Sequence, residues 1–309
     1  MGRHADRVSQ ATAPPDRRIM LGYAYAGLIV VLWAGFSLAA RFSARNGGVD
    51  GLTPWDLGAL RYSLAFTIAA GLWAAGRGRG LPWRRSFVLA MLAGFGFALP
   101  SYAGFRFAPT AHGALILSGA LPFLVAALGT LVLHERWAGT SRLSLLLLAA
   151  GFVLVGTEAY AHGHAPPGAW RGDLLFLFAA TSWALYTVLA RRWQPSPLQS
   201  IVTVGLWCGP LFLPVWWFLL PSHLAAAPWG EVAFQAFYQG IVAVVVSLWL
   251  FTKALAILGP SRLAAITALV PGTAALVAVP LLDEPLGTLT LLGLVAVCAA
   301  VAVGAKLGR

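Results

Sequence analysis

Charged residues are scarce in this chain: Asp, Glu, Lys and Arg make up 10% of its 309 residues, whereas 59% are hydrophobic. A soluble globular domain carries about 25% charged residues, so this composition does not supply a water-facing surface. The scarcity excludes a water-soluble enzyme, a disordered chain and a nucleic-acid-binding domain, although the formal net charge is +11. The class that remains is an integral membrane protein surrounded by the lipid bilayer.

Cysteine and acidic residues are also few. The two cysteines, Cys208 and Cys298, lie in apolar runs and make neither a redox pair nor a zinc framework. The ten Asp and Glu residues all fall in tails, loops or predicted helix ends, whereas proton- or sodium-coupled carriers usually keep a carboxylate at mid-membrane. We therefore expect no catalytic residues, no metal and no cofactor.

Ten apolar runs are long enough to cross a bilayer, which takes about 20 residues per helix. We predict an all-α integral membrane protein with ten transmembrane helices, preceded by a disordered, basic cytoplasmic tail over residues 1–21. The predicted helices cover residues 22–40, 54–76, 86–107, 110–133 and 141–159, followed by 172–192, 198–220, 232–254, 263–282 and 286–306.

The basic residues orient these helices, because Lys and Arg are retained in cytoplasmic loops during insertion. Sixteen of them lie in the tails and in the loops after the second, fourth, sixth and eighth predicted helices. Only four lie in the alternate loops, and Arg61 is left inside a helix. Both termini are therefore predicted to be cytoplasmic, and the net charge reflects orientation rather than a nucleic-acid partner.

The two halves of the chain repeat each other. Each half has five predicted helices, an odd number, so the second half enters the membrane from the opposite side, as in many secondary transporters. We predict a first repeat at 22–160 and an inverted second repeat at 171–306, joined by a loop at 161–170; chance alignment of apolar sequence is the alternative. The matched pairs are Ser118 with Thr267, Pro122 with Pro271 and Glu135 with Glu284 at an offset of 149, and Trp33 with Trp183 at 150.

These features resemble the drug/metabolite transporter superfamily, specifically its ten-helix EamA-type members, over roughly residues 22–306. The resemblance rests on Leu60-Arg61-Tyr62, on Phe105-Arg106, and on the segments from proline to glutamate that close the fourth and ninth helices. Within the superfamily, the sequence is similar to the YddG-type exporters of aromatic and other neutral amino acids. This similarity rests on His112-Gly113 and on the mid-helix tryptophans. The resemblance implies a multi-pass efflux carrier of the inner (plasma) membrane.

Two prolines give the first candidate site. A proline inside a membrane helix frees the carbonyl four residues earlier, and lipid offers that carbonyl no partner. Pro122 and Pro271 therefore free the carbonyls of Ser118 and Thr267, whose hydroxyls add polar groups near mid-span. We expect them to face a central cavity and bind substrate. The alternative is a kinked packing helix whose hydroxyl bonds back to its own backbone.

Aromatic residues away from the membrane interface are the second group of candidates. Trp33 and Trp183 fall mid-helix, too deep for an aromatic belt, and Tyr186 lies nearly one turn after Trp183. Aromatic faces on a cavity wall suit an aromatic or amphipathic solute, whereas packing between helices is the alternative for each residue. Further candidates for this wall are Tyr102, Tyr238 and Trp249.

Two ionisable residues lie inside predicted helices. His112, near the outer end of the fourth helix, is a candidate to bind substrate or sense pH, with hydrogen-bonded packing as the alternative. Arg61 lies about seven residues inside the second helix, and we expect it to reach outward toward Asp56 or Asp50 rather than bind a substrate carboxylate. The glutamates that end the fourth and ninth helices are expected to bond loop amides.

We therefore predict a secondary transporter that exports aromatic or other neutral amino acids and related metabolites by alternating access, through facilitated diffusion. It requires a small-molecule substrate and a bilayer, no nucleic acid and no oligomer. One alternative is an exchanger of nucleotide sugars or phosphorylated metabolites, which needs Lys or Arg at cavity depth. A drug efflux carrier is another. An intramembrane enzyme ranks lower, because the spans contain no acid pair, Ser-His dyad or metal cluster.

The position of the acidic residues predicts how transport responds to ion gradients. Purified protein in proteoliposomes should move substrate down its own gradient, and an imposed proton or sodium gradient should change the rate by less than about two-fold. Short-term uptake of labelled substrate, with and without each gradient, measures this. Accumulation against the substrate gradient, driven by either ion, would contradict the prediction.

Overall fold

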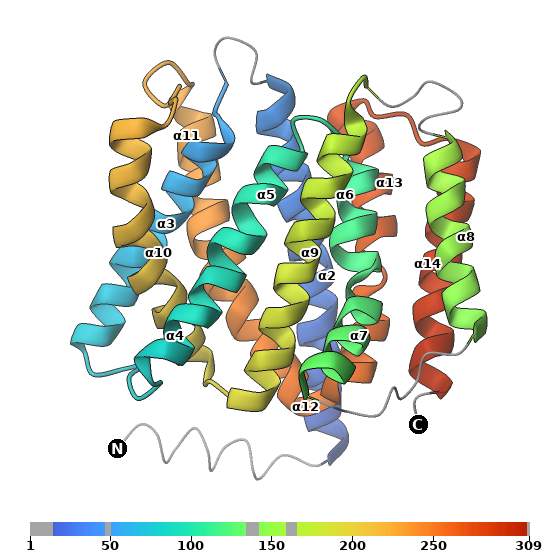
Figure 1. Cartoon of the computed structure of the whole chain (residues 1–309), viewed down its shortest axis with the longest axis horizontal. Helices are drawn as coiled ribbons and strands as arrows, with labels where there is room; N and C mark the ends of the chain where they lie inside the picture. The colour runs from blue at the N-terminus through green and yellow to red at the C-terminus, as the bar shows by residue number, and fades with distance from the viewer. Residues whose placement is uncertain (1–14, 47–50, 134–141, 159–165, 308–309) are drawn as a thin grey trace.

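The computed structural model describes residues 15–46, 51–133, 142–158 and 166–307, and within these ranges the chain is helical, with no strand (Figure 1). The first half contains α2 (Pro15–Asn46), α3 (Pro54–Ala74), α4 (Trp83–Ala90), α5 (Gly96–Gly104), α6 (Thr110–Ala114), α7 (Leu121–Leu133) and α8 (Arg142–Gly156). The second half contains α9 (Ala169–Trp193), α10 (Pro197–Leu219), α11 (Trp229–Gln235), α12 (Ser247–Thr267), α13 (Val270–Leu282) and α14 (Thr288–Leu307).

The length and apolar character of these helices are those of a multi-pass membrane protein. Seven continuous helical stretches are long and apolar enough to cross a membrane, and the described residues contain three shorter apolar helices besides. Each predicted span overlaps one of them. Helix α2 begins at Pro15, so residues 15–21, which were predicted to belong to the disordered tail, are helical; residues 1–14 lie outside the described residues.

Three helices change to the wider π form partway along. These π segments are η1 (Met91–Phe95) between α4 and α5, η2 (Leu115–Gly119) between α6 and α7, and η4 (Ala236–Val246) between α11 and α12; residues 157–158, after α8, also have the π form. A π segment shifts the hydrogen-bond ladder by one residue, and such segments are frequent at functional sites. All three lie on helices that border the central pocket described below.

Helices α3 and α10 begin with the same device, although they lie in different halves of the chain. Thr53 and Ser196 each accept a hydrogen bond from the amide three residues later, and the side chains of Asp56 and Gln199 each accept one from the cap residue's own amide. A proline occupies the first helical position of both. These capping boxes satisfy amides that lipid would leave without a partner.

The helices pack in pairs across the two halves of the chain. Helix α3 lies along α10, α8 along α14, α2 along α12 and α13, and α9 along α5 and α7. The α3–α10 contact is close because Gly205 faces Ala65 and Ala69, and the α8–α14 contact because Gly151 and Gly293 face each other. Small residues at a crossing let helix backbones approach, which is the usual way that membrane helices associate.

The α3–α10 contact predicts a specific loss of stability. A β-carbon at Gly205 would overlap the carbonyl oxygen of Ala65 and the β-carbon of Ala69, so Gly205→Ala should lower the free energy of unfolding by about 1–3 kcal/mol. Gly27→Ala is the matched control, since no heavy atom lies within 4 Å of the added carbon. Thermal unfolding in detergent measures both variants, and equal melting temperatures would contradict the packing argument.

Candidate functional site

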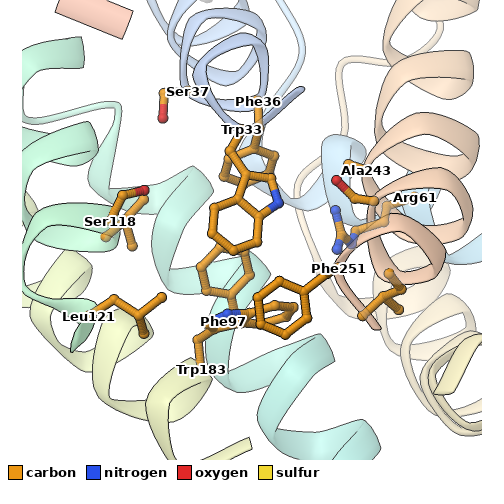
Figure 2. Close-up of a pocket in the computed structure, with 13 residues that line it drawn as sticks. Trp33, Phe36, Ser37, Arg61, Phe97, Ser118, Leu121, Trp183, Ala243 and Phe251 are labelled. Carbon is orange, nitrogen blue, oxygen red and sulfur yellow. The ribbon is translucent and has the colours of Figure 1, made fainter. Parts of the chain in front are cut away.

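A pocket of about 40 Å³ lies in the middle of the bundle, between helices from both halves (Figure 2). A single water needs about 10–15 Å³, so the pocket has room for a few waters. It is lined by Trp33, Phe36, Ser37, Arg61, Phe97, Leu117, Ser118, Leu121, Trp183, Ala243, Ser247, Leu248 and Phe251.

Aromatic rings form much of the wall. Trp33 meets Trp183 edge to face at 6.1 Å between ring centroids and stacks on Phe251 at 5.6 Å. Trp183 also contacts Phe97 at 4.9 Å and Tyr186 at 5.0 Å. The structure thus brings together the two mid-helix tryptophans that the sequence singled out. Tyr186 supports Trp183 from outside the pocket lining.

The helices that contain the matched prolines Pro122 and Pro271 are each interrupted just before that proline. The helix ending at Gly119 bends at Ala120, before Pro122, and the one ending at Thr267 turns at residues 268–269, before Pro271. Ser118 lines the pocket, as predicted for that residue. The hydroxyl of Thr267 instead donates to the carbonyl of Leu263 at 3.1 Å, the bond back to its own helix that was the alternative.

Arg61 corrects the sequence prediction. We expected its side chain to reach outward to Asp56 or Asp50, but it lines the central pocket, its residue is 4% exposed, and its Nη1 donates to the Tyr102 hydroxyl at 3.4 Å. Asp56 is already engaged: its carboxylate is bonded by Thr53, Trp216 and Ser222 side chains and by the Thr53 and His223 amides. That network ties α3 to the segment after α10. Asp50 lies outside the described residues.

The remaining candidates lie away from this pocket. The Nδ1 of His112 is 2.9 Å from the Oδ1 of Asp173, and His112 lines a second cavity of about 260 Å³ near the ends of α2 and α13. The hydroxyl of Tyr238 donates to the Leu32 carbonyl at 2.9 Å and lies against Gly35. Trp249 is 36% exposed and packs on Tyr25.

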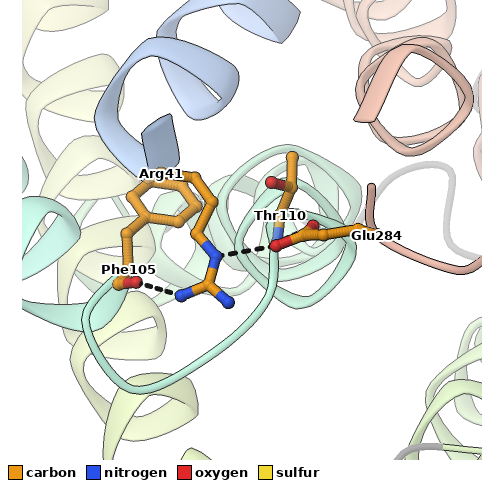
Figure 3. A network of polar contacts seen from close by, with 4 residues as sticks. All are labelled: Arg41, Phe105, Thr110 and Glu284. Atoms are coloured by element: carbon orange, nitrogen blue, oxygen red, sulfur yellow. Dashed lines mark hydrogen bonds and ion pairs between the residues drawn. The ribbon is translucent and has the colours of Figure 1, made fainter. Parts of the chain in front are cut away.

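An ion pair links three segments at the upper end of the bundle (Figure 3). Arg41, in the last part of α2, donates from Nε to Glu284 at 2.7 Å and from Nη1 to the carbonyl of Phe105 at 2.6 Å. Glu284 also accepts the Thr110 amide at 3.0 Å, which confirms that this glutamate bonds a backbone amide. Its predicted counterpart, Glu135, lies outside the described residues. The network holds the ends of α2 and α13 to the start of α6.

Several lining residues were missed by sequence reasoning. Phe36 and Ser37 follow Trp33 by three and four positions, so the helical repeat places all three on one face. This spacing could have identified both residues from the sequence. Phe97 comes from α5, and Ser247 and Phe251 come from α12. Only the folded arrangement assigns these three to the pocket.

Comparison with known proteins finds similarity to transporters. Residues 170–304 match the model of the EamA-like transporter family, a segment that coincides with the predicted second repeat. The chain is 26% identical over 227 residues to YyaM of Bacillus subtilis (strain 168), described as an uncharacterized transporter. The alignment covers 69% of this chain and 74% of that protein. These similarities point to a transporter rather than an enzyme.

A solved crystal structure has the same fold. It aligns with 94% of this chain and 96% of its own chain, with a TM-score of 0.62 and 20% sequence identity. At that identity the likeness concerns the fold alone. It extends the similarity beyond the second half of the chain, to which the family model is confined.

The Arg41–Glu284 pair predicts a stability loss that depends on burial. The two side chains are 11% and 13% exposed, so Glu284→Gln leaves a largely buried cation without its carboxylate and should cost about 3 kcal/mol. Arg106→Gln removes an exposed charge from the same end of the bundle and is the control. Thermal unfolding in detergent measures the change, and adding Arg41→Gln to Glu284→Gln should recover part of the loss. Additive losses would contradict the pairing.

Proposed function

We propose that the protein is a secondary transporter that exports aromatic or other neutral amino acids and related metabolites, in the manner of the YddG-type carriers. The observation that carries the proposal is the central aromatic pocket, to which Trp33 of the first half and Trp183 of the second half contribute side by side. Flat apolar walls with a few polar groups suit a solute that has an aromatic or apolar part and a polar end. The family match supports transport as the activity.

The proposed architecture is two inverted repeats, at residues 22–160 and 171–306, with ten spans. The packing pairs support it. If each helix is replaced by its counterpart in the other half, the α2–α12 contact becomes the α9–α5 contact, and the α2–α13 contact becomes the α9–α7 contact. The α3–α10 and α8–α14 contacts stay the same under this exchange. The matching capping boxes of α3 and α10 agree with this relation. Such a repeat provides two conformations of similar energy that face opposite sides of the membrane.

We propose that both termini are cytoplasmic and that the membrane is the inner (plasma) membrane. Helix α2 begins and α14 ends at the same, lower end of the bundle in Figure 1, which supports the predicted topology. The last turn of α9, which contains Arg191 and Arg192, is at that end as well. The concentration of basic residues there is what the positive-inside rule expects of the cytoplasmic face.

Alternating access requires the bundle to open at each end in turn. In the described conformation the Arg41–Glu284 network joins α2, α6 and α13 at the upper end, and the pocket is too small for an amino acid. Substrate entry therefore requires the helices around the pocket to separate. The interruptions before Pro122 and Pro271 offer hinges, because the backbone there already departs from a continuous helix.

An exchanger of phosphorylated metabolites remains the second candidate, because Arg61 supplies a cation at cavity depth. A phosphate carries close to two negative charges and is usually held by several cationic donors. Arg61 is the one cationic side chain among the described residues of the pocket lining, which favours a singly charged group.

Counterflow in proteoliposomes tests the proposed function. Liposomes preloaded with unlabelled phenylalanine should take up labelled phenylalanine faster than empty liposomes do. Trp183→Ala should raise the half-saturating concentration by about ten-fold because it removes buried aromatic contact, and Ser118→Ala should raise it by about three-fold. Trp217→Ala, at a residue 72% exposed on α10, is the matched control.

The same assay ranks the alternatives. Nucleotide sugars, sugar phosphates and cationic drugs replace phenylalanine in parallel experiments. Counterflow of a phosphorylated metabolite without counterflow of any amino acid would overturn the proposed substrate, and wild-type behaviour of Trp183→Ala would overturn the proposed site.

A further inference from the structure

Arg61 is a buried cation that forms no ion pair within the part of the chain that the structure describes. Its Nη1 donates to Tyr102, while its Nε is buried and has no hydrogen-bond partner. A guanidinium stays charged in proteins, and a charge inside the membrane is costly unless it is compensated. Figure 2 shows its nitrogens turned toward the centre of the pocket, across Trp33 from Ser118. A ligand that supplies negative charge there would remove the cost.

A chain of hydrogen bonds reaches Arg61 from the side opposite the pocket and holds it in place. Each donor points away from Arg61, so the chain runs in one direction from the cation to a carboxylate at the start of α11, and its bonds polarise one another. Beyond Tyr102, the links are Tyr102 to Gln239 at 2.9 Å, Gln239 to Gln235 at 3.1 Å, Gln235 to Ser43 at 3.0 Å and Ser43 to Glu231 at 2.5 Å. The chain uses Nη1 and leaves Nε for a ligand.

A second unsatisfied polar group faces the same pocket. Ser247 is 4% exposed and lines the cavity, and its hydroxyl has no hydrogen-bond partner in the structure. Buried polar groups are nearly always paired, so two orphan donors on one cavity indicate a polar ligand. A carboxylate has two oxygens that accept hydrogen bonds, and it pairs well with a guanidinium.

We propose that Arg61 binds the substrate carboxylate, with Ser247 as a second donor, and that the substrate class is aromatic monocarboxylates. This proposal rests on the proposed function, because it takes the central pocket as the transport site. The aromatic part of the substrate packs on Trp33 and Trp183. No Asp or Glu occurs among the described residues that line the pocket, so an ammonium group finds no counter-charge.

The consequence is selectivity for the carboxylate over the amine. Loss of the amino group costs little, because the pocket has no carboxylate to pair with it. Loss of the carboxylate removes the Arg61 contact and brings a positive amine near a positive guanidinium. Phenylalanine and 3-phenylpropionate should therefore bind with similar affinity, and 2-phenylethylamine should bind about ten-fold more weakly or worse.

Calorimetric titration of the full-length protein in detergent with these compounds tests the assignment. Arg61→Gln should weaken both carboxylates by about ten-fold or more and leave the amine unchanged or slightly tighter. Arg61→Lys keeps the charge but loses the planar fork, so it should weaken them less. Arg106→Gln, which removes an exposed arginine, is the matched control. Thermal unfolding identifies a variant that fails to fold, and Ser247→Ala, a smaller change, should still weaken both carboxylates about three-fold.

Counterflow of the same compounds separates this inference from the proposed function. Equal binding of amine and carboxylates, or wild-type carboxylate affinity in Arg61→Gln, would overturn the Arg61 assignment even if phenylalanine is transported. Arg61-dependent binding of carboxylates without counterflow would support the assignment and overturn the transport function. Failure of the wild-type protein to bind any of the compounds would overturn both.

Discussion

Lipid offers no hydrogen-bond partner, and the structure is arranged around that constraint. Helices satisfy the backbone within each segment, and the capping boxes of α3 and α10 satisfy amides at their ends. Polar side chains in the bundle follow the same rule: Asp56 is bonded by several donors, and Glu284 bonds both Arg41 and an amide. Asp56 and Glu284 thereby join segments that are distant in sequence.

Two exceptions to this rule lie together in the central pocket. Arg61 and Ser247 each present a buried polar atom without a partner, in a cavity otherwise walled by aromatic rings. The surrounding helices are also the ones interrupted by π segments and by the breaks before Pro122 and Pro271. Two unsatisfied donors and several stretches of irregular backbone therefore occur around the same pocket. In a binding site that opens and closes, unsatisfied donors bind the ligand, and breaks in the helices let them bend.

Much of the helical arrangement was predictable, because hydrophobic runs and prolines are local signals. The predicted helices coincide with observed ones to within a few residues at most ends, and the matched residues of the two halves led to Trp33, Trp183 and Ser118 in the pocket. The same logic misled at Thr267, whose hydroxyl bonds its own helix, and at Trp249, which packs on Tyr25 outside the pocket. Positions that match between the two halves of the sequence therefore need not have the same surroundings in the folded chain.

The sequence by itself determined that the chain is a membrane protein and where its helices run, because transfer of apolar residues into lipid depends on local composition. It also indicated which end of each helix carries the positive charge. Only the tertiary structure decided the partner of Arg61. Asp56 is near it in sequence, but its carboxylate is occupied by donors from α10 and the segment that follows. Tyr102 of α5 accepts the hydrogen bond from Arg61 instead, and in turn donates to Gln239. Partners of buried charges are set by packing between distant helices, which no local pattern records.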